Sequence, residues 1–143
     1  MVIISTNKGV RNYRARQSGP YPGSVNIAWV NNDEAVGYIT FIKFKCVTST
    51  VVADRYVYVE IEVGSDTTNS MRVRVDSEFP QPASTTYTYF IALGYESKKI
   101  GNSVYLSLPR IYAERVTSVT YEVVNKQSGD QVRDFEFMTT TII

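Results

Sequence analysis

Two neighbouring segments alternate between apolar and polar residues, and this period of two constrains the fold more than any other feature. The segments are 57–63 and 71–75, and the polar stretch 64–70 separates them. Successive side chains of a strand point to opposite faces of its sheet, so each segment places its apolar set on one face. If Val63 lies opposite Met71, both apolar sets share the core and the register is fixed. The outer face then sets opposite charges against each other: Glu60 and Glu62 against Arg72 and Arg74.

The side chains of the whole chain favour strands over helices. It contains 19 Val, 11 Ile and 14 Thr, against 3 Leu and 7 Ala. Residues branched at Cβ suit the pleated surface of a sheet, whereas Leu and Ala favour helices. The 11 Tyr and 6 Phe point the same way. An all-helical fold is therefore close to excluded.

Further strand candidates follow at short intervals between turn signals. They are Val25–Val30, Val36–Cys46, Thr85–Leu93, Val104–Leu108, Ile111–Val124 and Val132–Met138. We expect the last of them to pair back across the turn Asn125–Asp130 as a second hairpin. With eight or nine strands and no alternation of strands with helices, a parallel sheet is unexpected. The pattern predicts an all-β fold: an antiparallel β-sandwich, jelly-roll-like, or a small barrel, with an extended N-terminal arm.

The first 24 residues differ in charge from the remainder of the chain. Residues 1–32 contain four basic groups and no acid, whereas the whole chain has a net charge of +1. The segment Gly19-Pro20-Tyr21-Pro22-Gly23 cannot form a central strand, because its two prolines lack backbone N–H donors. We expect a basic N-terminal strand or arm and a loop over 1–24, and a single β-sandwich domain over 25–143. The arm cations would contact a neighbouring subunit, make weak, salt-sensitive contacts with nucleic acid, or simply be solvated. They are Lys8, Arg11, Arg14 and Arg16.

The C-terminal stretch is strongly β-prone and carries no charged side chain. It comprises Thr139, Thr140, Thr141, Ile142 and Ile143. Left exposed, such a segment would promote aggregation, so we expect it to pair, either within the subunit or along the open edge of a neighbour. Our hypothesis is an inter-subunit tail.

Catalytic and metal-binding signals are sparse. The chain has no His and one cysteine, which excludes His-based triads, a zinc site built from cysteines and an intrachain disulfide. Glu60 and Glu62 have the spacing of an inverting glycosidase pair, but Arg72 and Arg74 across the hairpin would keep both ionised.

Cys46 shares the parity of the apolar Ile42 and Phe44 and is expected to be buried. The segment Asn31–Glu34 offers oxygens for calcium, yet a plain turn explains it. We expect no enzyme, catalytic residue, cofactor or metal.

The apolar runs of the sequence are too short for a signal peptide or a membrane helix. The run Val2–Ile4 is too short for the core of a signal peptide, and no stretch reaches about 18 apolar residues. We therefore expect no signal peptide, no membrane partner and assembly in the host cytoplasm.

Tyrosine enrichment supports an alternative, a carbohydrate-binding module or lectin that uses outward aromatic rings. The candidates for partly outward rings are Tyr13, Tyr21, Tyr56, Tyr58, Tyr87, Tyr89, Tyr95 and Tyr105. Cross-strand packing on a half-buried sheet explains the same rings without a ligand.

A basic arm before a compact domain rich in Thr, Val and Tyr is similar in layout to small virion proteins. These include jelly-roll coat proteins and the β-sandwich decoration or tail proteins of bacteriophages. The resemblance covers layout and carries no motif. It implies a non-enzymatic structural protein that assembles with copies of itself or other virion proteins into a capsid, decoration or tail.

Overall fold

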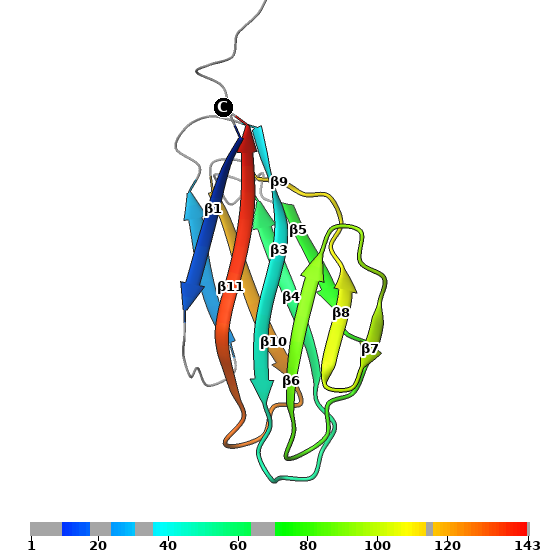
Figure 1. Cartoon of the computed structure of the whole chain (residues 1–143). Helices are drawn as coiled ribbons and strands as arrows, with labels where there is room; N and C mark the ends of the chain where they lie inside the picture. Colours follow the sequence, from blue (N-terminus) through cyan, green and yellow to red (C-terminus); the bar gives the residue numbers. More distant parts are fainter. Residues whose placement is uncertain (1–9, 18–23, 31–35, 64–70, 114–115, 143) are drawn as a thin grey trace, which may run out of the picture.

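The computed structural model describes residues 10–17, 24–30, 36–63, 71–113 and 116–142, and these residues form two packed β-sheets (Figure 1). Sheet A has the strand order β1-β11-β3-β6-β8-β7, with β9 paired to β3, and sheet B has the order β2-β10-β4-β5. The described part of the chain contains no helix that could span a membrane.

The strands coincide closely with the alternating segments of the sequence. In sheet A they are β1 (Val10–Gln17), β3 (Val36–Val47), β6 (Thr86–Ala92), β7 (Lys98–Ile100), β8 (Ser103–Ser107), β9 (Tyr112–Ala113) and β11 (Gln131–Ile142). In sheet B they are β2 (Ser24–Val30), β4 (Tyr56–Val63), β5 (Met71–Asp76) and β10 (Val116–Val124). The predicted hairpin is confirmed in its register, because Val63 pairs with Met71 and Val59 with Val75.

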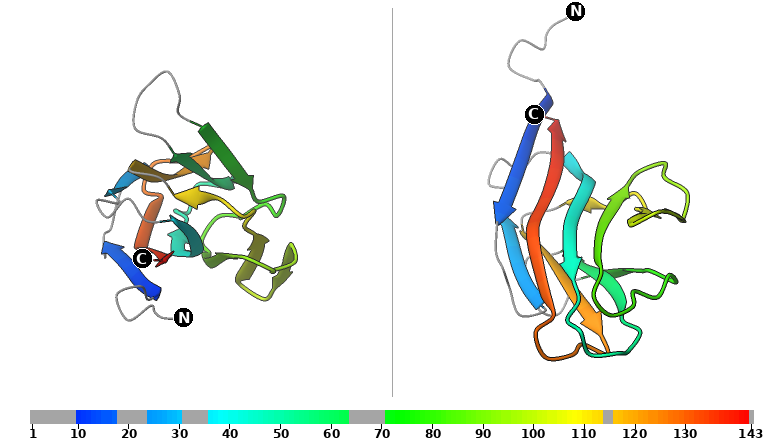
Figure 2. Two further views of the ribbon diagram at one scale, coloured as in Figure 1. Left: turned by 90° about the horizontal axis from the view of Figure 1, so that it is seen from above. Right: turned by 60° about the horizontal axis from the view of Figure 1, so that its bottom comes forward.

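With β7, β8 and β9 set aside, the other strands pair as one long nested hairpin. The first strand pairs with the last, β1 with β11, and inside this pair lie β2·β10, β3·β6 and β4·β5, all antiparallel. Figure 2 shows β1 alongside β11. Two further antiparallel pairings, β11·β3 and β10·β4, roll this ribbon into two sheets. A rolled antiparallel ribbon of eight strands in two sheets is the jelly-roll arrangement. The prediction of a jelly-roll-like sandwich is confirmed, and the described strands do not close into a barrel.

The core lies between the sheets and is built from alternate residues of the central strands. Four of its rings stack on one another: Phe44 lies 5.1 Å from Tyr89, 5.4 Å from Tyr121 and 5.6 Å from Phe135, measured between ring centroids. All four side chains are fully buried. Burial of such large apolar rings is a dominant contribution to the stability of a sandwich.

Strand pairing differs from a simple antiparallel succession at two places, and at the second of them a sequence-based expectation is wrong. The strands β6 and β8 pair in parallel, because the segment between them crosses over and places β7 outside β8. The expected hairpin of β10 and β11 is absent: β10 lies in sheet B and β11 in sheet A. The turn between them spans the two layers, and each of the two strands finds partners far away in the sequence.

Candidate functional site

The arm cations divide between described and undescribed parts of the chain. Lys8 lies outside the described residues, as do Tyr21 and Asn31–Glu34. The other three belong to β1, where Arg11 is the register partner of Thr141, Arg14 of Met138 and Arg16 of Glu136. The described portion of the arm is therefore an edge strand of sheet A, not a segment separate from the sandwich.

The tail lies between two strands of its own chain. Thr139–Ile142 form the end of β11 and pair with β1 on one side and β3 on the other, while Ile143 is outside the described residues. In the isolated chain both backbone edges of the tail are thus occupied. Addition to a neighbour's sheet would require an exchange of strands between copies.

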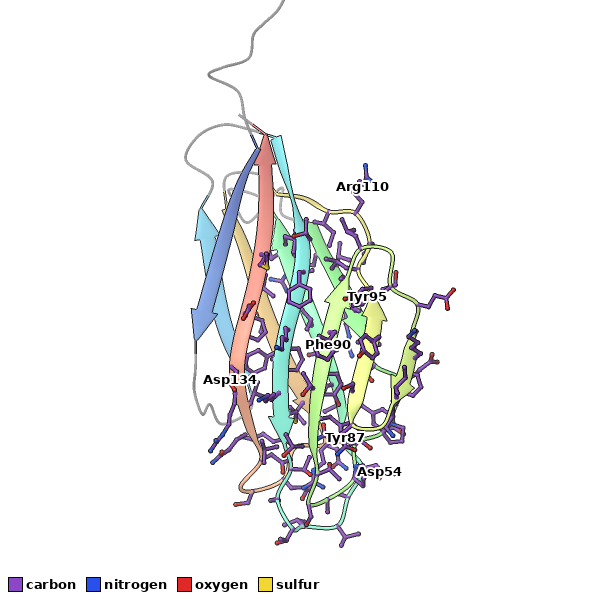
Figure 3. The ribbon with its side chains drawn as sticks, viewed as in Figure 1. Asp54, Tyr87, Phe90, Tyr95, Arg110 and Asp134 are labelled. Carbon is purple, nitrogen blue, oxygen red and sulfur yellow. The ribbon has the colours of Figure 1, made fainter. Side chains whose placement is uncertain are left out.

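One register row crosses sheet A and combines charged and aromatic residues. Starting at β1, each member of the row pairs with the next: Arg16, Glu136, Lys43, Phe90, Tyr105 and Lys98. Neighbouring core residues such as Ile42, Tyr89 and Val104 point inward, and the described members of the row lie on the outer face. Figure 3 shows Phe90 and Tyr95 on this face.

The rings of this row form a stack with a lysine at each end. Phe90 and Tyr105 are nearly parallel, with centroids 5.1 Å apart and an interplanar angle of 13°. The Lys43 Nζ lies 5.5 Å from the Phe90 centroid, and the Lys98 Nζ lies 5.7 Å from the Tyr105 centroid. Because Lys43 and Lys98 come from strands on opposite sides of the ring pair, the flat faces of both rings are covered.

A hollow of about 460 Å³ opens beside this stack. It is lined by Gly94, Tyr95, Glu96, Lys98, Ile100 and Tyr105. Tyr95 meets Tyr105 edge-on at 5.7 Å, and Ile100 is 60% exposed. Gly94 has a φ of +79°, a conformation that glycine adopts without a steric penalty, and this allows the chain to turn tightly out of β6.

The tyrosines expected to face outward divide into two groups. Tyr56 and Tyr95 are exposed, and Tyr58 and Tyr105 are half-buried. The expectation is wrong for Tyr87 and Tyr89, which lie in the core with 5% and 0% exposure. They share the parity of Ile91, and in β6 this parity faces sheet B. Tyr13 lies in β1, and its side chain is outside the described part of the structure.

The two glutamates of the hairpin lie on the outer face of sheet B beside arginines. The Arg72 Nη1 lies 3.6 Å from a Glu60 oxygen, and its Nε lies 3.4 Å from a Glu62 oxygen. Arg74 instead pairs with Asp76 at 2.8 Å and covers the Tyr58 ring at 3.6 Å. The cations next to Glu60 and Glu62 give an exposed charge ladder and disfavour the paired acid and base of a glycosidase.

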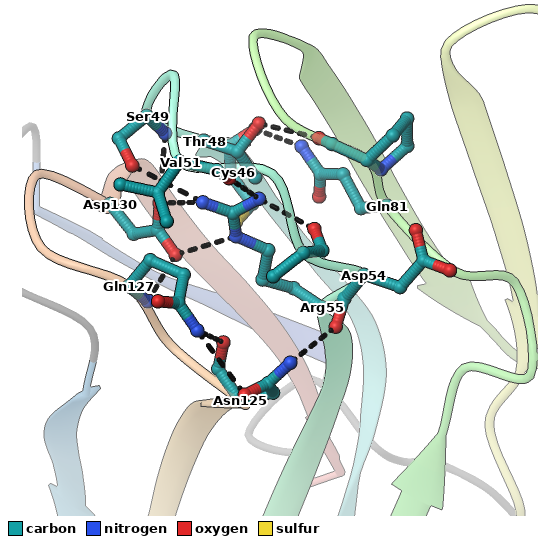
Figure 4. A network of polar contacts seen from close by, with 12 residues as sticks. Cys46, Thr48, Ser49, Val51, Asp54, Arg55, Gln81, Asn125, Gln127 and Asp130 are labelled. Atoms are coloured by element: carbon teal, nitrogen blue, oxygen red, sulfur yellow. Dashed lines mark hydrogen bonds and ion pairs between the residues drawn. The ribbon is translucent and has the colours of Figure 1, made fainter.

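At one end of the sandwich a buried ion pair joins two loops (Figure 4). Arg55 precedes β4 and Asp130 precedes β11, and both side chains are fully buried. The Arg55 Nε donates to Asp130 Oδ2 at 2.9 Å, and Nη2 donates to Oδ1 at 3.0 Å. The remaining guanidinium N–H groups donate to the carbonyls of Val51 and Ala53 and to Ser49 Oγ. All five donors of the guanidinium therefore have acceptors.

The Asp130 carboxylate is equally well satisfied. Besides Arg55, the backbone N–H groups of Ser49 and Gln127 donate to it, each at 2.8 Å. Burial opposes ionisation, but the hydrogen bonds from Arg55 and from these two N–H groups outweigh it and hold the pKa of Asp130 below its ordinary value.

Gln81 connects the third loop to this cluster. Its backbone exchanges two hydrogen bonds with the backbone of Arg55, at 2.9 and 2.8 Å. Its side-chain Nε2 donates to the Cys46 carbonyl at 2.8 Å, and its Oε1 accepts from the Tyr89 hydroxyl at 2.9 Å. We call Arg55, Asp130 and Gln81 the polar clamp. Sequence analysis missed it, because nothing in the local pattern separates these residues from ordinary loop residues.

Cys46 is buried, as its parity predicted. Burial and the nearby Asp130 carboxylate raise the pKa of the Cys46 thiol to about 12. The thiol is therefore protonated at neutral pH and a poor nucleophile. Among the described residues no group of three or more His, Cys, Asp or Glu side chains is arranged to hold a metal ion.

The geometry defines a jelly-roll β-sandwich with a closed polar clamp at one end and charged outer faces. No protein-family model matches the chain, and no curated protein matches its sequence.

Solved structures of infectious bursal disease virus are similar in part. The Gx strain structure has a TM-score of 0.48 and 12% identity and covers 96% of this chain and 33% of that one. The T13 particle has a TM-score of 0.44 and 9% identity, with 96% and 35% covered. The VP2 subviral particle has a TM-score of 0.36 and 9% identity, with 97% and 34% covered. This chain thus spans about a third of the length of those chains, and at these TM-scores the likeness establishes no family.

Proposed function

We propose that this chain is a non-enzymatic structural protein that assembles with copies of itself, or with other virion proteins, into a virus particle. The observation that carries the proposal is the jelly-roll winding of the strands. Capsid domains use this fold, although lectins and cupins do so too, so the step from fold to function is an analogy. The rigid sandwich would supply the wall of the particle.

The chain ends are the proposed links between subunits. Among the described strands, β1 pairs with β11 alone and forms the edge of sheet A. An edge strand held on one side can leave its own β11 and pair with that of a neighbour, because the hydrogen bonds formed are the same. In this proposal the Arg residues of β1 travel with it, and Thr139–Ile142 become the acceptor of a neighbour's strand. The arm cations would contact the neighbouring subunit or make weak, salt-sensitive contacts with nucleic acid. They are Lys8, Arg11, Arg14 and Arg16.

Assembly is tested by light scattering after size exclusion, together with electron microscopy of the full chain. We expect defined particles or oligomers at high protein concentration. A chain that stays monomeric at every concentration and ionic strength would overturn self-assembly and leave only assembly with other virion proteins.

Strand exchange is tested with cysteines at register partners. Asn12 and Thr140 are opposite each other in the β1·β11 pairing. In the Asn12→Cys/Thr140→Cys variant, exchanged strands give covalent multimers after oxidation of the assembled sample. A product that stays a single chain on a non-reducing gel contradicts exchange and leaves assembly by other contacts open. The Asn12→Cys variant alone is the matched control.

Carbohydrate binding is the second candidate, and the hollow beside Tyr95 favours it. Against it, the flat faces of Phe90 and Tyr105 are covered by each other and by lysines, whereas a sugar needs an open face. A glycan array with the Tyr95→Ala variant as control decides: signals lost on substitution support a lectin, and a blank array excludes it for the glycans displayed.

A further inference from the structure

The two sheets carry charges of opposite sign. The strands of sheet A contain three Arg in β1, Lys43 and Lys45 in β3, the Lys98–Lys99 pair in β7 and Arg133 in β11, against two acids in β11. Sheet B has four acids and two bases. These charges are Glu60, Glu62, Asp76 and Glu122 against Arg72 and Arg74. A chain that is almost neutral overall is thus basic on one sheet and acidic on the other.

Most of the described charges lie on the outer faces. Lys99 is an exception, because it pairs with the buried Val104 and its Nζ lies 5.1 Å from the centroid of the buried Tyr87 ring. Lys43 and Lys98 lie over the rings of the aromatic stack and form no ion pair with any other described residue. On sheet B, Glu122 is exposed and accepts a hydrogen bond from the Tyr58 hydroxyl. Lysines on one face and carboxylates on the other therefore remain available to an outside partner.

Each outer face also exposes apolar groups beside its charges. On sheet A, Tyr95 and Ile100 flank the hollow with exposures of 38% and 60%. On sheet B, Tyr56 and Val124 are register partners with exposures of 41% and 44%, and they lie next to Glu122. Apolar and aromatic centres with a charged surround are typical of protein interfaces.

We propose that the outer face of sheet A in one copy docks on the outer face of sheet B in a second copy. This rests on the proposed self-assembly and names the surfaces that carry it. The contact joins two different faces, so it propagates from copy to copy and closes into a ring or continues as an open array. Complementary charge steers the encounter and fixes its register.

The observations favour a second copy over nucleic acid as the occupant of the basic face. Single-stranded nucleic acid binds such surfaces by stacking bases on open aromatic faces. Here Phe90 and Tyr105 stack on each other and lysines cover their outer faces, so these two rings offer no platform. The acidic complement, in contrast, is present on the same molecule.

The test reverses one charge on each face. Lys98→Glu and Glu122→Lys are each expected to weaken self-association about tenfold or more, because like charges then face each other. An equimolar mixture of the two variants should restore association, since each supplies the face that the other has lost. Matched controls reverse an exposed charge at the loop end of the sandwich, with Lys126→Glu for the first variant and Asp54→Lys for the second. Sedimentation velocity at low and high salt gives the affinities, and circular dichroism verifies folding.

The outcomes separate this inference from the proposed function. Weaker association in each variant, its recovery in the mixture and unchanged controls support the docking of sheet A on sheet B. Association that neither reversal alters, or that the controls alter equally, overturns the docking and leaves self-assembly standing. A Lys98→Glu variant that loses affinity for single-stranded RNA but not for itself also overturns it, in favour of nucleic acid. A wild-type chain that stays monomeric throughout overturns the docking together with the self-assembly on which it rests, and leaves only assembly with other virion proteins.

Discussion

Two ion pairs in this protein join the same types of group in opposite surroundings. Arg55 and Asp130 are fully buried, are 75 residues apart in the sequence and have every donor and acceptor position occupied. Arg72 lies beside Glu60 and Glu62 on an exposed hairpin, with contacts of 3.6 and 3.4 Å and a side chain that is 65% exposed. Burial, and not the chemical identity of the ions, distinguishes the two regions.

The difference shows where charge supports the fold and where it remains available for recognition. A buried ion deprived of its partner cannot be rescued by water, so the polar clamp is costly to break. An exposed ion exchanges its partner for water at little cost, so the ladder contributes little to stability. The clamp therefore holds the β3–β4, β5–β6 and β10–β11 connections together, while the outer faces are free to serve contacts.

The largest expected effect comes from breaking the clamp. Arg55→Ala leaves the Asp130 carboxylate buried without its cation and should lower the free energy of unfolding by about 3–5 kcal/mol. Urea unfolding followed by tryptophan fluorescence measures it. The paired replacement Arg55→Met/Asp130→Leu removes both charges and should cost clearly less. An Arg55→Ala variant as stable as the wild type would contradict the comparison.

The next effect concerns the neutral member of the clamp. Gln81→Ala leaves the Cys46 carbonyl and the Tyr89 hydroxyl without the partners they have now, and should cost about 1–3 kcal/mol. Tyr89→Phe removes one of these bonds together with its donor and should cost less. Thermal unfolding of the two variants side by side gives the order, and the reverse order would show that packing outweighs the hydrogen bonds.

Acid should weaken the clamp selectively. The pKa of Asp130 is lower in the folded protein than in the unfolded chain, so its contribution to stability is present above about pH 4 and is lost as the pH falls through the folded value. Urea midpoints between about pH 6 and pH 2 should fall with a slope that Asp130→Asn reduces. Equal slopes in both proteins would assign the acid sensitivity to other carboxylates.

The smallest expected effect lies in the exposed ladder. Arg72→Ala should cost no more than about 1 kcal/mol, and high salt should reduce the difference further. Chemical unfolding in low and high salt tests this. A loss as large as that of Arg55→Ala would remove the distinction between the two regions.

The sequence by itself determined the parts of the fold that depend on period and local pairing. Alternation over 57–63 and 71–75 fixed the strands, the faces and the register of the β4·β5 hairpin, because a shift by one residue would expose the apolar set. The alternation that Cys46 shares with Ile42 and Phe44 likewise predicted that its side chain lies in the core. Strand count and turn spacing predicted an antiparallel sandwich, jelly-roll-like, or a small barrel, and did not decide between them.

The tertiary structure decided everything that joins distant segments. The strands β10 and β11 are neighbours in sequence but lie in different sheets, where each pairs with strands far away in the chain. The strands β6 and β8 run parallel in a sheet whose other pairings are antiparallel. The polar clamp assembles from three loops, and the row containing Lys43, Phe90 and Tyr105 is drawn from separate strands. Periodicity records which face a residue takes, whereas the partner across a sheet depends on how the whole ribbon rolls, and no local pattern encodes that.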